Sequence, residues 1–168
     1  SCSLVGSEMC IRDSITIDLL ASGNETTTAA IGSGLKLLIE DPDALNDVLA
    51  EPELIPTLAE EILRLESPAQ GMFRRCAHSG NLAGVSLEEG ELLNIRFGAA
   101  NRDEAQFSEP DRINLQRKKP GSHLAFGMGR HVCVGAALAR QEIISAFQAL
   151  TRRYDRFWLL PDRPAPVY

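Results

Sequence analysis

Apolar residues recur at helical spacing over the first quarter of the chain, with one short polar break. Ile15, Leu19, Leu35 and Leu38 belong to this pattern, which predicts one long helix from residue 14 or 15 to about residue 40. The break, SGNETTT, contains a glycine, which costs roughly 1 kcal/mol relative to alanine inside a helix. Threonine hydroxyls can bond to carbonyls one turn earlier and bend a continuous helix. A loop joining two shorter helices is the alternative.

Two further helices are expected before residue 70. The segment DPDALNDVLAEP starts with Asp41 and Pro42, and proline is common at the first position of a helix. The segment ELIPTLAEEILRLESP follows, with apolar residues at helical spacing. Pro68 helps to end this helix, because the residue before a proline disfavours helical geometry.

The periodicity changes in the middle of the chain. The segments GMFRRCA, NLAGVSL and ELLNIRFGA are short, apolar and separated by the turn formers HSG and EEGE, a pattern that predicts strands. Residues 101–122 show little periodicity and many turn formers, so we expect an irregular surface segment. We refer to residues 101–122 as the meander.

A final helix is expected from about Gly135 to Tyr154. Its apolar residues fall at positions that would form one buried stripe: Ile143, Phe147, Leu150 and Tyr154. The chain contains neither internal repeats nor a linker-like segment, which indicates a single domain or part of one.

Composition excludes several functional classes. The net charge of −6 argues against a nucleic-acid-binding protein, which normally has a basic face. No apolar run approaches the roughly 20 residues that cross a membrane as a helix. The cysteines have irregular spacing with no CxxC pair, so neither a disulfide framework nor a zinc site is indicated. This usage suits a reduced compartment such as the cytoplasm.

The first fourteen residues have neither apolar periodicity nor the pattern of a signal peptide. The segment SLVGSEMCIRDS resembles a translated sequencing adapter, and a disordered natural terminus is the alternative. We expect residues 1–14 to be an artefactual leader that belongs to no domain. The ending PDRPAPVY looks cut, so residues 15–168 would be part of a domain truncated at both ends.

One cysteine stands out by its neighbours. Cys133 directly precedes the last predicted helix, where free amide hydrogens and the helix dipole favour a thiolate. Phe126 and His131 flank it, and three glycines give the backbone room to approach something flat and bulky: Gly127, Gly129 and Gly135. An inert buried cysteine and a catalytic nucleophile are the alternatives, although no histidine–acid pair is marked out for the latter.

The spacing F-x-x-G-x-H-x-C-x-G, at residues 126–135, resembles the haem-binding signature of the cytochrome P450 family. The resemblance implies that Cys133 is the thiolate ligand of the iron of a haem b. It also implies that Phe126 and the three glycines lie against the cofactor, with His131 donating to a haem propionate.

The break in the first helix resembles a second element of that family. Gly23, Glu25 and Thr26 match its small-Gly-x-acid-Thr pattern, with Ser22 where alanine or glycine is more common. In the family this break makes room for dioxygen, and the acid and hydroxyl relay protons. Glu25 and Thr26 are therefore the implied catalytic residues.

Glu61 and Arg64 match the family's E-x-x-R pair, and Arg112 in PDRI lies where the family has an arginine that joins them. Ile113 replaces the more usual phenylalanine there. The resemblance implies a buried structural network. An exposed ion pair, contributing a few tenths of a kcal/mol, is the alternative.

Arg74 lies where the family has an arginine that reaches a haem propionate, a natural guanidinium–carboxylate pairing. Strand alternation would turn Arg75 to the opposite face. His123 could be a further propionate donor or could cap the loop, and both remain open.

The resemblance covers residue 15 to the end and implies the C-terminal portion of a mainly α fold with small β-sheets. It implies a bacterial-type haem-thiolate monooxygenase that uses dioxygen and a small apolar substrate. Electrons would come from NAD(P)H through a ferredoxin reductase and a ferredoxin. A peroxide-dependent peroxygenase and a non-catalytic haem-thiolate binding protein are the alternatives. The fragment itself is expected to be inactive.

Overall fold

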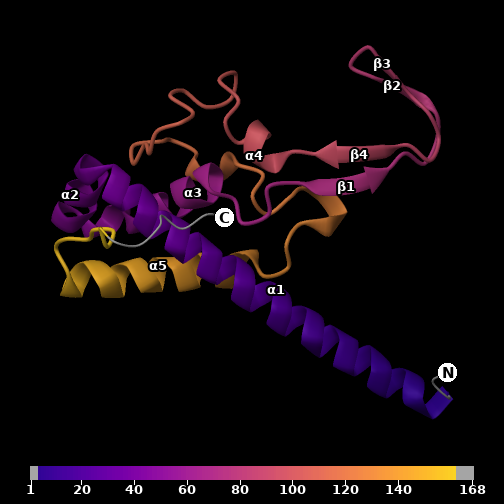
Figure 1. Cartoon of the computed structure of the whole chain (residues 1–168), viewed down its shortest axis with the longest axis horizontal. Helices are drawn as coiled ribbons and strands as arrows, with labels where there is room; N and C mark the ends of the chain where they lie inside the picture. The colour runs from indigo at the N-terminus through magenta and orange to yellow at the C-terminus, as the bar shows by residue number, and fades with distance from the viewer. Residues whose placement is uncertain (1–3, 162–168) are drawn as a thin grey trace.

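The computed structural model describes the backbone of residues 4–161 and the side chains of residues 10–161. One long helix, α1 (Leu4–Glu40), opens the fold. Its first half extends away from the rest of the molecule, and its second half packs into it (Figure 1). The helix begins ten residues earlier than expected, inside the segment assigned to a leader. Once a helix is nucleated, each added residue costs little, so α1 continues backward without tertiary support.

The polar break does not interrupt α1, so the prediction of a loop between two shorter helices is wrong. Thr26 Oγ1 donates to the carbonyl of Ser22 at 2.6 Å, and Thr28 Oγ1 donates to that of Asn24 at 2.7 Å. These bonds satisfy the hydroxyls within the helix itself.

The next two helices confirm the sequence prediction. Helix α2 (Pro42–Ala50) is capped by Asp41, whose carboxylate accepts from the amide of Ala44 at 3.1 Å. A short 3₁₀ turn, η1 (Pro52–Leu54), leads into α3 (Ile55–Leu65).

The strands form two small antiparallel pairs. Strand β1 pairs with β4, and β2 pairs with β3 in a hairpin that projects from the body (Figure 1). Ala83 and Gly84, at the hairpin turn, both have positive φ. A short helix, α4 (Phe97–Ala100), follows β4 where the sequence indicated a continuing strand. The strands are β1 (Met72–Arg75), β2 (Gly80–Leu82), β3 (Val85–Leu87) and β4 (Leu92–Ile95).

The meander is irregular, as expected, and ends in the 3₁₀ turn η2 (Pro120–Ser122). A second 3₁₀ turn, η3 (Gly129–His131), precedes the last helix, α5 (Ala136–Arg153). Ile143 and Phe147 are buried, whereas Leu150 is partly exposed. The prediction that Tyr154 is buried is wrong, because the chain turns extended at this residue and its ring is exposed.

The core lies where α1, α2, α3 and α5 meet. Its fully buried apolar side chains come from all four helices: Leu38, Val48, Ile55, Leu58, Ile62, Ile143 and Phe147. A Cβ atom added at Gly34 of α1 would come within 2.5 Å of Ile62 Cδ1 and 2.7 Å of Phe147 Cζ. Only glycine therefore permits α1 to cross α3 and α5 this closely.

The fold is mainly α with small β-sheets, as the sequence predicted. None of the helices in the described part of the chain is long and apolar enough to span a membrane.

Candidate functional site

Cys133 lies on an exposed loop directly before α5. Its amide donates to the carbonyl of Phe126 at 2.9 Å, which closes residues 126–133 into a compact loop. The thiol is exposed, in contrast to the alternative of an inert buried cysteine. We refer to residues 123–135 as the cysteine loop.

The three glycines of this loop serve different purposes. Gly127 and Gly129 have φ of +70° and +82°, a region that side chains with a Cβ rarely adopt. They are needed for the turn itself, a reason that spacing alone did not reveal. Gly135 has an ordinary φ, but a Cβ there would lie 3.8 Å from Cys133 Sγ. Glycine at 135 therefore keeps the sulfur uncovered.

Several apolar residues near Cys133 in the cysteine loop face solvent. Met128 is 78% exposed, Val132 53% and Val134 93%. A Cβ added at Gly129 would meet nothing within 4 Å, so the backbone there is open as well. An exposed sulfur amid apolar side chains and bare backbone fits a flat, apolar, thiolate-ligated group such as haem.

The two predicted propionate donors are both exposed. His131 ends η3, two residues before the cysteine. Arg74 lies on β1, where Nη1 donates to the carbonyl of Phe73 at 2.8 Å. Arg75 donates instead to the carbonyl of Gly90 at 2.6 Å. Among the described residues, no hydrogen bond links Arg74 to His131.

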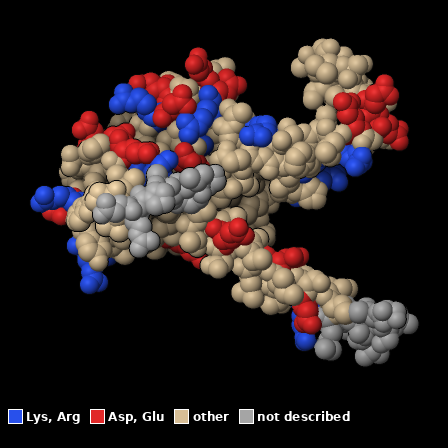
Figure 2. All heavy atoms as spheres, viewed as in Figure 1, with Lys and Arg blue, Asp and Glu red and all other residues tan. Residues whose placement is uncertain are grey.

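Glu25 and Thr26 lie on the exposed half of α1. Thr26 is occupied by its bond to Ser22, and among the described residues no hydrogen bond connects it to Glu25. The molecule is deeply hollowed between the projecting half of α1 and the strand hairpin (Figure 2).

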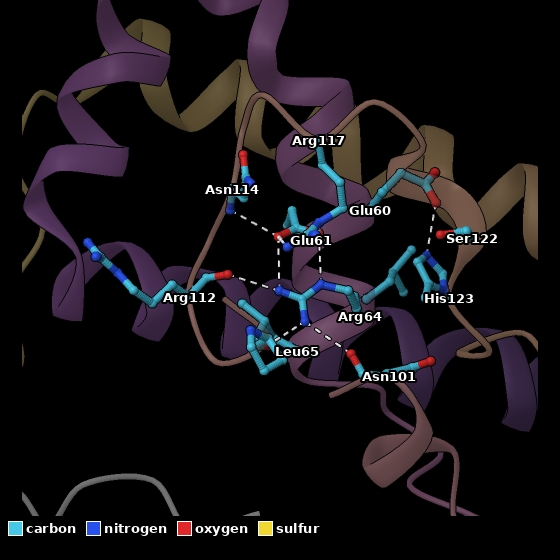
Figure 3. A network of polar contacts seen from close by, with 12 residues as sticks. Glu60, Glu61, Arg64, Leu65, Asn101, Arg112, Asn114, Arg117, Ser122 and His123 are labelled. Carbon is cyan, nitrogen blue, oxygen red and sulfur yellow. Dashed lines mark hydrogen bonds and ion pairs between the residues drawn. The ribbon is translucent and has the colours of Figure 1, made fainter. Parts of the chain in front are cut away.

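Glu61 and Arg64 form a fully buried pair, both with side chains 0% exposed. Arg64 Nε donates to Glu61 Oε1 at 2.8 Å, and Nη2 donates to Oε2 at 3.0 Å. The remaining hydrogens of Arg64 go to three meander carbonyls, at Asn101, Pro110 and Arg112 (Figure 3). The alternative of an exposed ion pair is therefore wrong.

The arginine that joins this pair is Arg117, and the expectation for Arg112 is wrong. Arg117 Nε donates to Glu61 Oε1 at 2.9 Å. The side chain of Arg112 is exposed and pairs with Glu109, so only its backbone carbonyl takes part. Three arginines of the meander were available, and a segment without periodicity gave no signal to choose among them.

The network holds Glu61 ionised. Burial raises the pKa of this carboxyl, but hydrogen bonds from Arg64 and Arg117 outweigh burial, so the pKa lies below its usual range. The amide of Asn114 adds a further bond at 2.9 Å. The ring of Phe107 contacts both guanidinium groups. Its centroid lies 5.3 Å from Cζ of Arg64 and 5.5 Å from Cζ of Arg117.

His123 is buried and bonded to a residue that the sequence did not single out. Its Nε2 lies 2.9 Å from Glu60 Oε2, which favours the loop-capping alternative over a propionate donor. Glu60 also binds Arg140 of α5, with Nε 2.5 Å from Oε1. Burial raises the pKa of Glu60, and bonds from His123 and Arg140 lower it below its usual range.

One family model and several known proteins match this chain. The model of the family described as Cytochrome P450 matches residues 53–164. The chain is 45% identical over 139 residues to "Putative cytochrome P450 140" of Mycobacterium bovis, covering 83% of this chain and 31% of that protein. It is 45% identical over 137 residues to "Cytochrome P450 107B1" of Saccharopolyspora erythraea, covering 81% and 34%. The chain thus spans about a third of the length of these relatives.

Solved structures also match this chain. A crystal structure of CYP109E1 from Bacillus megaterium in complex with testosterone superposes with a TM-score of 0.85 at 38% identity, covering 90% of this chain and 42% of that one. P450BioI in complex with a fatty-acid-ligated acyl carrier protein superposes with a TM-score of 0.75 at 39% identity, covering 79% and 34%. With the family model matching most of the described residues, this chain belongs to the cytochrome P450 family.

Proposed function

We propose that this chain carries the thiolate side of a bacterial haem-thiolate monooxygenase, with Cys133 as the iron ligand. The observation that carries the proposal is an exposed thiol at the start of α5, set among apolar side chains and open glycine backbone. When bound, haem b supplies the chemistry that inserts one atom of dioxygen into a substrate.

The loop residues would each contribute to holding the cofactor. Gly127 and Gly129 form the turn without adding side chains, and Gly135 leaves the sulfur uncovered. Phe126 fixes the loop through its carbonyl bond to the Cys133 amide. His131 and Arg74 are exposed donors that suit the haem propionates. Support for these two roles comes from their position in the family motifs.

Glu25 and Thr26 are proposed to deliver protons to dioxygen. A carboxylate can exchange protons with water, and a hydroxyl can pass them on. The Thr26 hydroxyl donates to Ser22 within α1, so its oxygen remains available to accept from a neighbour. Support for the relay comes from the match of Glu25 and Thr26 to the family motif, and the Thr26 hydroxyl would have to leave the carbonyl of Ser22 to pass a proton on.

The length of the relatives bears on how much of a P450 domain this chain holds. Since the chain spans about a third of its relatives, we propose that it is the C-terminal part of one P450 domain, truncated at both ends. Its meander is held against α3 by the network of Glu61, Arg64 and Arg117. Electrons would come from NAD(P)H through a ferredoxin reductase and a ferredoxin. One neighbour binds testosterone, which supports a small apolar substrate.

The test is the ferrous–CO spectrum of a complete P450 domain containing this chain. We expect the red-shifted Soret band of thiolate ligation and its loss in Cys133→His. The band should be retained in Cys76→Ser, which changes the cysteine directly after β1. An unshifted band in the unmodified protein contradicts the proposal. Turnover with peroxide but not with reductase, ferredoxin and NAD(P)H would indicate a peroxygenase, and haem binding without product would exclude an enzyme.

A further inference from the structure

Glu60 binds two partners that are far apart in the sequence. Its Oε2 lies 2.9 Å from His123 Nε2, and its two oxygens lie 2.5 and 3.2 Å from Nε and Nη2 of Arg140. The side chain of His123 is 1% exposed and that of Glu60 13%. Neither residue belongs to the Glu61 network, although Glu60 and Glu61 are neighbours on α3 (Figure 3).

The two partners lie on either side of the thiol. His123 opens the cysteine loop, and Arg140 lies in the second turn of α5, just after the loop ends. One carboxylate on α3 therefore ties down both the entrance to the loop and its exit. Charge-assisted bonds of this kind are stronger than neutral ones.

A second set of contacts connects this carboxylate to Cys133 itself. The Arg140 guanidinium lies 4.6 Å from the centroid of the Phe126 ring. The carbonyl of Phe126 accepts from the amide of Cys133 at 2.9 Å. His123 Nδ1 accepts from the amide of Ala125 at 3.2 Å, which leaves Nε2 as the nitrogen that donates to Glu60.

We propose that Glu60, His123 and Arg140 are positioning residues that hold the cysteine loop against α3 and so fix the location of the Cys133 thiol. The inference rests on the proposed function only in treating that thiol as the metal ligand. The contacts of Glu60 stabilise the buried side of the loop and leave the opposite side, with the sulfur, open.

Amide hydrogen exchange of the whole chain, followed at single residues by NMR, tests this proposal without haem. In Arg140→Met we expect the Cys133 amide to exchange about tenfold faster, because the charged bond that restrains the loop is lost. The amides of Ile143 and Phe147 should be unchanged. Arg152→Met, at an exposed arginine of the same helix, is the matched control and should leave all three unchanged.

Histidine variants distinguish a specific bond from simple filling of space. His123→Leu should accelerate Cys133 exchange as Arg140→Met does, and His123→Gln, which keeps an N–H donor for Glu60, should largely restore it. The proposal is wrong if Arg140→Met matches the unmodified chain, or if exchange rises equally at Ile143 and Phe147. It is also wrong if Gln is no better than Leu. A missing thiolate Soret band would instead refute the haem ligand and leave this result intact.

Discussion

The meander and the cysteine loop are both irregular, and adjacent carboxylates of α3 hold both of them, yet they are built in opposite ways. The meander turns its backbone inward: the carbonyls of Asn101, Pro110 and Arg112 all accept from the buried Arg64. The cysteine loop is anchored on one side by Glu60 and leaves Cys133 exposed on the other.

The difference shows two ways to make irregular backbone rigid. In the meander, the buried charge of Arg64 must be paired, and it bonds to Glu61 and to three backbone carbonyls. In the cysteine loop, Gly127 and Gly129 adopt conformations that fix the turn without covering it. The first solution turns three backbone carbonyls toward the buried Arg64, whereas the second keeps one side free for a ligand.

The largest effect is expected from breaking the buried pair in the meander network. Arg64→Met removes both bonds to Glu61 and leaves three carbonyls without their donor, so the free energy of unfolding should fall by about 3–5 kcal/mol. Urea unfolding followed by circular dichroism measures this. Arg102→Met, which removes a half-exposed arginine bonded to Asp111 and Leu65, is the control and should cost about 1 kcal/mol. Equal losses would contradict the comparison.

A smaller effect should separate the two meander arginines. Arg117 is 9% exposed and bonded to Glu61, so Arg117→Met should cost about 2 kcal/mol. The side chain of Arg112 is 72% exposed, and Arg112→Met should change stability by less than about 0.5 kcal/mol. The same urea titration decides the matter, and a greater loss at Arg112 would overturn the assignment of Arg117.

In the cysteine loop, glycine substitutions should affect shape and access separately. Gly129→Ala forces a Cβ into a left-handed conformation and should cost about 1 kcal/mol. Gly135→Ala should cost less than about 0.5 kcal/mol, but its Cβ shields the sulfur, so iodoacetamide should modify Cys133 more slowly. Peptide mass spectrometry measures that rate. An unchanged rate in Gly135→Ala would refute the role of glycine 135.

The most gradual effect should come from acid. The pKa values of Glu60 and Glu61 are lowered in the folded chain, so both carboxylates stabilise it above the ordinary glutamate pKa. That contribution should decline as the pH falls below about 4.3 and be lost below the folded values. Unfolding free energies between about pH 6 and pH 3 measure the decline. In Arg117→Met it should be shallower, and an identical slope would contradict this origin.

The sequence predicted the elements of the fold better than their partners. Apolar periodicity located α2, α3 and α5, because buried stripes leave a repeating signal. It could not show that Glu61 and Arg64 are buried, since charged residues at the margin of a stripe look the same whether the meander covers them or not. Arg117, Glu60 and Arg140 were missed for the same reason: their contacts join segments far apart in the chain.

The break in α1 shows the limit of propensity. Glycine and three threonines predict a weak helix, yet the hydroxyls of Thr26 and Thr28 find acceptors inside it. The cysteine loop was the opposite case, because glycine, histidine and cysteine at fixed spacing carry their information locally. The positive φ of Gly127 and Gly129 nevertheless emerged only from the structure.

Gly34 sets how closely α1 packs on the body of the molecule. Its missing Cβ lets the helix rest directly on Ile62 and Phe147, and the helix stays in contact with the body as far as the buried Ala30 and Thr27, where its exposed half begins. Glu25 lies nine residues away, about 13 Å along the helix axis. A methyl group at Gly34 would clash with the side chains of Ile62 and Phe147 and tilt α1. The resulting displacement of the helix would increase toward its N-terminal half, which carries Glu25. The position of the proposed acid–alcohol pair thus depends on a residue that takes no part in its chemistry.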